Sequence, residues 1–324
     1  MRTPGRVLVR GGGVAGLCAA HELHAHGFAV ELVERQAEVG AGASGLAGGM
    51  LAPYCERESA PEDVLRLGRH ASDWWNAVLP GHVVCAGTLV VAPPRDAGEL
   101  ARFAARTEGY EWLDEAGIAA LEPSLEGRFR KGLFFREEAH LDPRAALLGL
   151  SGRLKAQGVR LHFGATEPPT GRFDHVVDCT GAAAIGAVPG LRGVRGEMLC
   201  LETAEVALAR PVRLLHPRHP LYIVPRGGGR FMVGATMIES DDAGPISARS
   251  LMELLNAAYA LHPAFGEARL IEARAGIRPA FDDNLPRVIR DGGTIFVNGF
   301  YRHGFLLAPA TARQAAHLMQ RKAA

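Results

Sequence analysis

Residues 6–34 constrain the fold more than any other part of the sequence. An apolar stretch, Arg6–Arg10, precedes the glycine turn GGGVAG, and a stretch with helical periodicity then leads through Gly27 to a second apolar stretch, residues 29–34. Short apolar runs bounded by glycine favour strands, whereas a 3.6-residue period favours a helix. The order strand, helix, strand predicts a βαβ unit.

The turn of this unit carries the spacing of a dinucleotide-binding fingerprint. Gly11 allows a sharp turn, Gly13 lets a diphosphate approach the backbone, and Gly16 lets the helix pack closely on the strand. The helix N-terminus then offers amides and a positive dipole to the diphosphate. Glu34 stands 18 residues after Gly16, at the end of the second strand, where a carboxylate accepts hydrogen bonds from ribose hydroxyls. A carboxylate there also disfavours the 2′-phosphate of NADP.

Strand and helix patterns alternate again in the middle and at the end of the chain. Between them, residues 194–237 contain short apolar runs separated by glycine and proline, which is typical of antiparallel strands. A final helix follows residue 304, and Pro309 is compatible with it only within the first turn or two. We therefore predict an α/β fold (α+β overall) in which a Rossmann-like domain (1–80, 141–195 and 272–324) is interleaved with a substrate-binding domain built on an antiparallel sheet with helices (81–140 and 196–271).

The composition narrows the class of partner. Lysine and arginine (36) balance aspartate and glutamate (35), so the formal charge of +1 gives no reason to expect nucleic acid or an anionic membrane as a partner. The five cysteines are scattered without a CxxC spacing, and no paired-ligand histidine motif occurs, so neither disulfides nor a metal are expected. No targeting segment or membrane span is recognised, and we expect a cytoplasmic protein that acts on a small molecule.

A glycine-rich segment, residues 40–58, allows two interpretations. It is either a flexible surface loop or a place where backbone lies against a flat ligand. Taken with the fingerprint and with YIVPR, FMVGATM, AGIRPAFDDNLP and NGFYRHGFLLAPAT, the segment GLAGGMLAPYCE resembles the D-amino-acid-oxidase-like family of FAD proteins. The resemblance covers nearly the whole chain and is strongest to glycine oxidases of the thiamin-biosynthesis type.

The resemblance implies a non-covalent FAD, since the last third of the chain holds no cysteine to which a flavin could be linked. It makes the Rossmann-like domain an FAD-binding domain. The residues that it implies for FAD are Gly11, Gly13, Val14, Ala15, Gly16, Glu34, Arg35, Ala43, Ser44, Gly48, Gly49, Met50, Gly181, Phe300, Tyr301, Arg302, His303, Gly304, Phe305 and Leu306.

The same resemblance implies a substrate site. Arg278 matches the arginine that binds the substrate carboxylate, and Tyr222 matches a tyrosine that hydrogen-bonds it. Met237 matches a wall position, and Arg302 falls near the amino end of the substrate. A guanidinium suits a carboxylate because it forms two parallel charge-assisted hydrogen bonds. None of the implied residues forms an acid–base pair.

The activity that the resemblance implies is oxidation of glycine, with sarcosine or D-alanine as further candidates. Hydride would pass from Cα to flavin N5, giving glyoxylate, ammonia and, after reaction with O₂, H₂O₂, in support of thiazole formation. A related amino-acid oxidase, a quinone-linked dehydrogenase, an NAD enzyme and a non-catalytic flavin module remain alternatives, and a homo-oligomer is left open. Pro220 replaces a histidine of some relatives, and the short segment 162–175 leaves the adenine contact unassigned.

Overall fold

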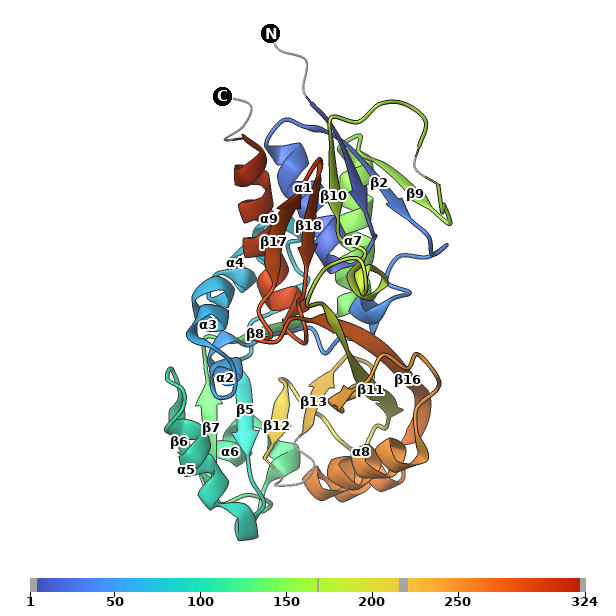
Figure 1. Cartoon of the computed structure of the whole chain (residues 1–324). Coiled ribbons are helices and arrows are strands. Elements are labelled where there is room, and N and C mark those ends of the chain that lie inside the picture. The colour runs from blue at the N-terminus through green and yellow to red at the C-terminus, as the bar shows by residue number, and fades with distance from the viewer. Residues whose placement is uncertain (1–4, 168, 216–220, 321–324) are drawn as a thin grey trace.

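The computed structural model describes residues 5–167, 169–215 and 221–320, which form two large sheets with helices around them (Figure 1). The first sheet contains the βαβ unit. Its strand order is β17-β18-β10-β1-β2-β9, and all neighbours are parallel except β17 and β18. The strands are β1 (Arg6–Arg10), β2 (Ala29–Glu34), β9 (Arg160–Phe163), β10 (His175–Asp178), β17 (Arg287–Asp291) and β18 (Thr294–Asn298).

The helices beside the first sheet bury its apolar residues. Helix α1 packs against α9, and both contribute to one core cluster with β1, β2 and β18. The predicted βαβ unit is thus confirmed, with the strands at the predicted residues. The helices of this cluster are α1 (Val14–Ala25), α3 (Glu62–Gly68), α4 (Ala71–Val78), α7 (Pro143–Ala156) and α9 (Gly304–Gln320), of which α3 and α4 pack on α9.

The second sheet is mainly antiparallel and lies below the first in Figure 1. Its order is β15-β11-β14-β13-β12-β5-β7-β6, and β16 pairs with the free side of β11. The strands are β5 (Thr88–Val91), β6 (Glu111–Asp114), β7 (Lys131–Phe135), β11 (Arg192–Glu202), β12 (Val212–Leu214), β13 (Leu221–Pro225), β14 (Arg230–Gly234), β15 (Ile238–Glu239) and β16 (Arg269–Ala280).

Shorter elements cover the second sheet and connect it to the first. A three-stranded sheet joins β3 (Met50–Leu51), β8 (Ala139–Leu141) and β4 (Val83–Val84). The remaining helices are α2 (Pro53–Arg57), α5 (Gly98–Ala104), α6 (Glu115–Leu121) and α8 (Ala248–Leu261), with the 3₁₀ turns η1 (Ala43–Leu46), η2 (Pro94–Asp96), η3 (Pro123–Leu125), η4 (Gly181–Ala184) and η5 (Pro263–Gly266).

The predicted fold class is confirmed, because the chain passes repeatedly between a mostly parallel and a mostly antiparallel sheet. The exact domain boundaries stay a prediction. Residue 272, the predicted start of the last FAD-binding segment, lies inside β16, which pairs with β11 of the second sheet up to Ala280.

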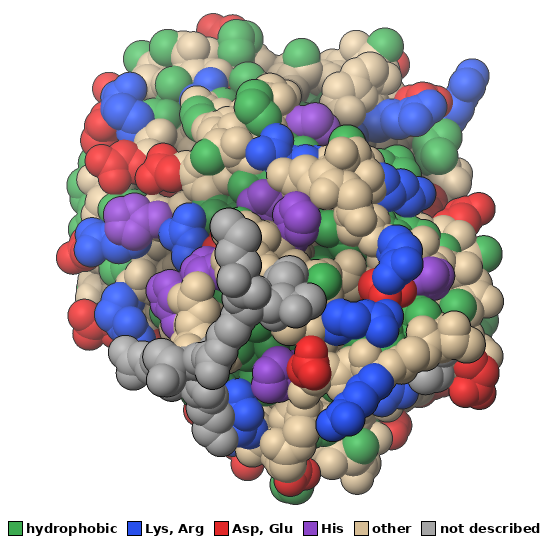
Figure 2. Space-filling view, turned by 90° about the horizontal axis from the view of Figure 1, so that it is seen from above, with side chains coloured by type: hydrophobic (Ala, Val, Ile, Leu, Met, Phe, Trp, Pro, Cys, Tyr) green, Lys and Arg blue, Asp and Glu red, His purple; other side chains and the backbone are tan. Residues whose placement is uncertain are grey.

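One face of the molecule shows the mixed charge that the balanced composition suggests. Figure 2 shows acidic and basic side chains interspersed on the face seen from above. Within the described ranges, no helix is both long and apolar enough to cross a membrane.

Candidate functional site

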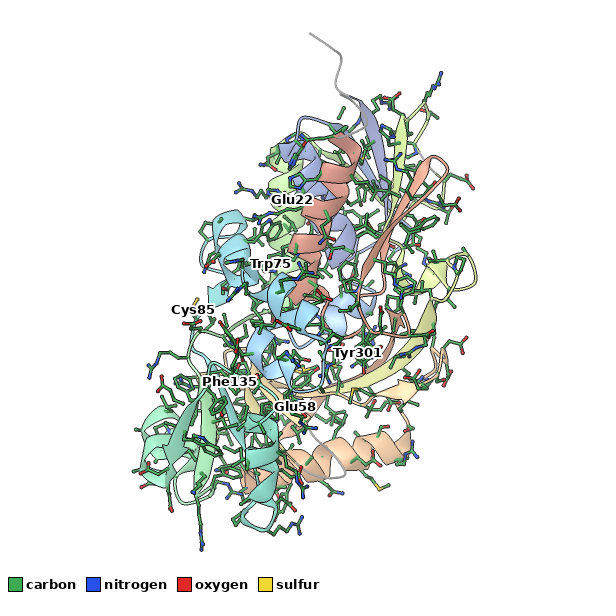
Figure 3. All side chains as sticks on the ribbon, turned by 60° about the vertical axis from the view of Figure 1, so that its left-hand side comes forward. Glu22, Glu58, Trp75, Cys85, Phe135 and Tyr301 are labelled. Carbon is green, nitrogen blue, oxygen red and sulfur yellow. The ribbon has the colours of Figure 1, made fainter. Side chains whose placement is uncertain are left out.

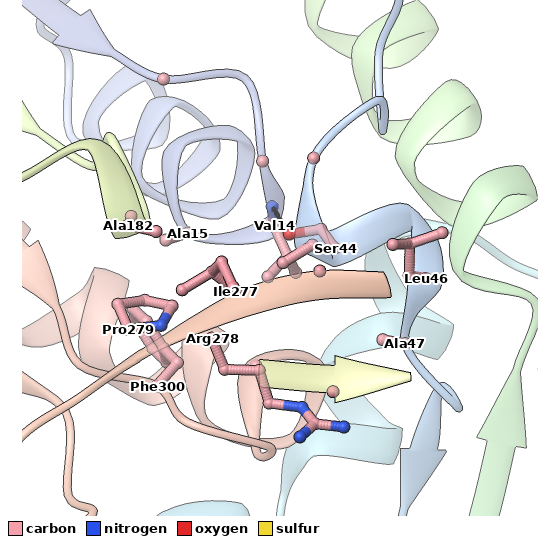
Figure 4. A pocket seen from close by; sticks show the side chains of 18 of the residues that line it. Val14, Ala15, Ser44, Leu46, Ala47, Ala182, Ile277, Arg278, Pro279 and Phe300 are labelled. Carbon is pink, nitrogen blue, oxygen red and sulfur yellow. Dashed lines mark hydrogen bonds between the residues drawn. The ribbon is translucent and has the colours of Figure 1, made fainter. Parts of the chain in front are cut away.

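A cavity of about 680 Å³ lies where the two sheets meet. Its walls come from the turn before α1, the glycine-rich segment around η1, the start of η4, strand β16 and the loop that leads into α9. Figure 4 shows Val14, Ala15 and Ser44 grouped near the start of α1, while the Arg278 side chain extends away from them. The cavity thus has a fingerprint end and an arginine end.

The fingerprint glycines are required by close backbone contacts. Gly11 has a φ of +100°, and a Cβ atom there would lie 2.5 Å from the carbonyl oxygen of Cys179. A Cβ on Gly16 would lie 1.8 Å from the carbonyl oxygen of Gly11, which explains why the helix can sit directly over the strand. At Gly13 a Cβ would stand 3.1 Å from Ser44 Oγ. Side chains at Gly11 and Gly16 would therefore collide with the backbone that builds the fingerprint turn.

Polar groups from two segments complete this end. Glu34 lines the cavity, and its Oε2 accepts a hydrogen bond from the Gly12 amide at 2.6 Å. The hydroxyl of Ser44 accepts from the amide of Val14 at 3.1 Å and so caps the first residue of α1. The carboxylate at the end of β2 therefore lies beside the backbone of the fingerprint turn, as the Glu34 prediction requires.

The glycine-rich segment is held in place by Arg226, which sequence reasoning did not single out. The Nη2 of Arg226 donates to the carbonyl oxygens of Ala47 (3.0 Å) and Gly48 (2.9 Å), and its Nη1 donates to that of Leu141 (2.9 Å). A Cβ on Gly48 would lie 2.8 Å from the ring of Tyr222. Of the two interpretations, the structure favours backbone fixed against a cavity.

Arg278 dominates the other end of the cavity. Its Nη1 donates to the carbonyl oxygen of Thr236 at 2.9 Å, and among the described residues no carboxylate lies within ion-pair distance of it. Burial lowers its pKa, but a guanidinium keeps its charge near neutral pH. Tyr222 also lines the cavity. Burial raises the pKa of its hydroxyl, and the positive charge of Arg278 opposes that shift. This end can bind an anion.

Arg302 also lines the cavity, but its charge is already balanced. Its Nη2 lies 2.6 Å from Glu56 Oε2. Burial alone would raise the pKa of Glu56, yet the Arg302 guanidinium above all, with His303 and Arg213 beside it, lowers this pKa to about 2. Burial lowers the pKa of His303 to about 4, so this imidazole is neutral at pH 7. Arg278, rather than Arg302, is the cation available to a carboxylate.

Tyr301 separates this cavity from a smaller one of about 350 Å³. It adopts a φ of 51°, its amide donates to the Pro279 carbonyl oxygen at 2.8 Å, and its hydroxyl donates to Met237 Sδ at 3.1 Å. Met237 is half exposed and lines the smaller cavity with His303. Neither of these two predicted residues reaches the main cavity.

The structure brings most of the predicted site residues together. Gly16 is packed against the Gly11 carbonyl, and Leu306 is buried against Gly68 in the core. Pro220 lies outside the described residues. Gly11, Gly13, Val14, Ala15, Glu34, Arg35, Ala43, Ser44, Gly48, Gly181, Tyr222, Arg278, Phe300, Tyr301, Arg302, Gly304 and Phe305 line the cavity, whereas Gly16, Gly49, Met50, Met237, His303 and Leu306 do not.

The cavity fits the FAD that the resemblance implies. The glycine turn gives a diphosphate access to backbone amides, Glu34 faces the same end, and Gly304 and Phe305 place the start of helix α9 at the wall. A helix N-terminus favours negative charge nearby. Within the described part of the chain, no cluster of three potential metal ligands occurs. The donors present suit an anionic dinucleotide.

Comparison with known proteins agrees with this geometry. The chain is 69% identical over 311 residues to a protein of Rhizobium etli that carries the name thiamine biosynthesis oxidoreductase ThiO, covering 96% of this chain and 95% of that one. It is 26% identical to the glycine oxidase of Bacillus licheniformis, covering 98% and 94%. The solved glycine oxidase of Bacillus cereus ATCC 14579 has the same fold, with a TM-score of 0.82 at 22% identity over 98% of this chain and 95% of that one.

The sequence also matches the model of a whole protein family. The sequence matches the family described as FAD dependent oxidoreductase (DAO) over residues 6–318, which is almost the entire chain. This chain is therefore a member of the DAO family of FAD-dependent oxidoreductases.

Proposed function

We propose that this enzyme oxidises glycine to glyoxylate and ammonia and that its product serves thiazole formation in thiamin biosynthesis. The observation that carries the proposal is Arg278, a guanidinium that faces the cavity without a carboxylate partner among the described residues. The names of the relatives from Rhizobium etli and Bacillus licheniformis support this choice of substrate and pathway.

The residues of the chain bind and orient the amino acid. Arg278 takes the carboxylate through two parallel hydrogen bonds, and the hydroxyl of Tyr222 donates a third. The ion pair of Arg302 and Glu56, whose charges cancel, lies toward the amino end of the substrate. When bound, FAD accepts two electrons from the substrate and passes them to O₂, which gives H₂O₂. The contribution of the protein is to fix the carbon to be oxidised relative to the cofactor.

Sarcosine and D-alanine are the alternative substrates, and a quinone is the alternative electron acceptor. One H₂O₂ per glyoxylate supports O₂ as the acceptor, whereas glyoxylate without peroxide supports a quinone. A cytoplasmic location is part of the proposal, and the five free cysteines support it, because thiols stay reduced there.

Replacing Arg278 tests the proposal. We expect Arg278→Ala to retain FAD and to lose about 2–5 kcal/mol of transition-state stabilisation for glycine, because one partner of a desolvated charge pair is removed. The measurement is kcat/KM for glycine together with flavin content. Arg269→Ala, an exposed arginine at the start of the same strand, is the matched control. An unchanged kcat/KM in Arg278→Ala would remove Arg278 from the substrate site and with it the basis of the proposal.

A further inference from the structure

Among the described residues, one backbone carbonyl and the close approach of Gly196 set the orientation of Arg278. Its guanidinium lies over Gly196, where an added Cβ would stand 2.2 Å from Cζ. The carbonyl oxygen of Thr236 accepts a hydrogen bond from Nη1 at 2.9 Å. With one face against Gly196 and one nitrogen held by Thr236, the direction of the remaining N–H groups is set by the position of Thr236.

Thr236 belongs to no strand, because β14 ends at Gly234 and β15 begins at Ile238. Three hydrogen bonds tie it to Glu197 of β11 instead. The Thr236 amide donates to the Glu197 carbonyl oxygen at 3.2 Å, and the Glu197 amide donates to Thr236 Oγ1 at 2.9 Å. The same hydroxyl donates to Glu197 Oε2 at 3.2 Å. The loop position is therefore defined by one buried glutamate.

Glu197 is itself fixed on its other side. It is 0% exposed, and its Oε1 accepts from Arg195 Nε (3.0 Å) and Nη2 (2.8 Å) and from the Ser247 amide (3.1 Å). Arg195 in turn donates to the carbonyl oxygen (2.6 Å) and to Oδ2 (3.1 Å) of Asp242. A buried carboxylate with this many partners has one available position, and the reaction proposed above makes no use of its charge.

We propose that Glu197 and Thr236 are positioning residues that aim the Arg278 guanidinium at the substrate carboxylate. The inference rests on the proposed function, because it takes Arg278 as the carboxylate-binding group. Loss of the Thr236 hydroxyl frees the loop, so the carbonyl no longer holds Nη1 in one place. Binding of any carboxylate then weakens, whereas the cofactor end of the cavity is unaffected.

The test replaces the hydroxyl by a methyl group of similar size. For Thr236→Val we expect KM for glycine and Kd for glycolate, a carboxylate of similar size without the amine, to rise together by about tenfold, the equivalent of one hydrogen bond. We expect kcat to change by less than about twofold, since the bound amino acid reaches the same geometry. Glycolate binding is read from the perturbation of the flavin spectrum.

Two further variants separate positioning from general damage. Thr236→Ser keeps the hydroxyl and should restore wild-type binding, and Thr203→Val, just beyond the far end of β11, should leave both constants unchanged. If Thr236→Val does not retain FAD, Glu197→Gln tests the same link, because its amide nitrogen cannot accept from the Thr236 hydroxyl. It should weaken glycolate binding in the same direction.

The outcomes distinguish this inference from the proposed function. Wild-type glycolate affinity in both Thr236→Val and Glu197→Gln overturns the positioning role, and so does weaker binding of glycine alone, which would put the effect at the amine. If Arg278→Ala abolishes glycolate binding while these variants do not change it, only the positioning role fails. If Arg278→Ala binds glycolate normally, the proposed carboxylate site fails first.

Discussion

Two buried carboxyl groups, Glu56 and Glu138, have pKa values shifted in opposite directions. Burial raises the pKa of both, and for Glu138 it brings the value to about 7 despite the Cys55 amide, which donates to Oε1 at 2.7 Å. The charge of Glu56 raises it further. Glu56 instead faces Arg302, and its pKa falls to about 2. The cationic groups around Glu56, of which Arg302 has the largest effect, thus keep one of the two buried carboxyl groups ionised.

Glu138 predicts a pH-dependent stability. The unfolded chain releases the proton near pH 4.5 and the folded chain near 7, so the folded state binds more protons between these values and loses stability as pH rises through this window. Glu138→Gln should therefore stabilise the protein at pH 8, by on the order of 3 kcal/mol, and have little effect at pH 4. Urea unfolding at both pH values measures it.

The neighbouring Glu137 is exposed and supplies the control for this variant. Glu137→Gln should leave the difference in unfolding free energy between pH 4 and pH 8 unchanged. An equal effect of Glu138→Gln at both pH values would mean that the gain comes from packing or hydrogen bonding, and that folding does not change the pKa of Glu138.

Some residues of the site could be predicted from the sequence, and others could not. Arg278 could be proposed because a cation between glycine, isoleucine and proline is unusual, and the resemblance gave it a role. Thr236 and Glu197 could not, because their role consists of contacts that only the folded chain creates, from Glu197 to Thr236 and from Thr236 to Arg278. Glu56 lies in a recognised motif, but nothing in that motif indicates that it neutralises Arg302, 246 positions later in the chain.

Helix α9 contains a proline in its second turn, which fits the limit expected from the sequence. Pro309 has no N–H, so the carbonyl oxygen of Phe305, four residues earlier, lacks its normal helical donor. The Nε1 of Trp75 in α4 donates to this oxygen at 2.9 Å. Figure 3 shows Trp75 beside α9. The partner is 230 residues away in sequence, which is why no local pattern could reveal it.

A double-mutant cycle tests this link between helices. Trp75→Phe should destabilise the protein by roughly 1–3 kcal/mol from the unsatisfied buried carbonyl, in addition to the loss of packing. In a Pro309→Ala background, residue 309 regains its N–H, so the same substitution should cost about 1 kcal/mol less. The free energy of unfolding in urea gives each corner of the cycle. Additive effects would show that the Trp75 hydrogen bond does not compensate for the proline.

At the scale of the molecule, the cavity lies between the two sheets, so the cofactor should stabilise both. A ligand that binds only the folded state at a free concentration about 100 times its Kd adds about 2.7 kcal/mol to the free energy of unfolding. We therefore expect FAD to raise the Tm of the flavin-free protein by several degrees in a single transition. Differential scanning calorimetry measures this shift.

FMN is the control ligand, because it lacks the adenosine part that the fingerprint end is built to receive. FMN should give a smaller shift at the same concentration. Equal shifts with FMN and FAD, or two separate transitions of which only one responds, would contradict a dinucleotide bound across both sheets.

The interleaved organisation could be predicted because strand–helix patterns and antiparallel patterns alternate along the sequence. The boundaries could not, because β16 carries cavity residues while it pairs with the second sheet, and an isolated bridge joins Ala280 to Phe300 beyond it. A strand that serves both parts has no change of composition at the point where one part ends.

The register of β16 has a consequence for variation in chain length. Side chains alternate between the faces of a strand, so a slip of one residue would turn Arg278 out of the cavity. The pairing with β11 is regular from Ala280 to Glu272, and its irregularity lies between Cys200 and Leu201, beyond the cavity. Insertions and deletions can therefore be absorbed at the start of β16, where the pairing is irregular. The end of β16 that carries Arg278 keeps a fixed spacing between cofactor and substrate.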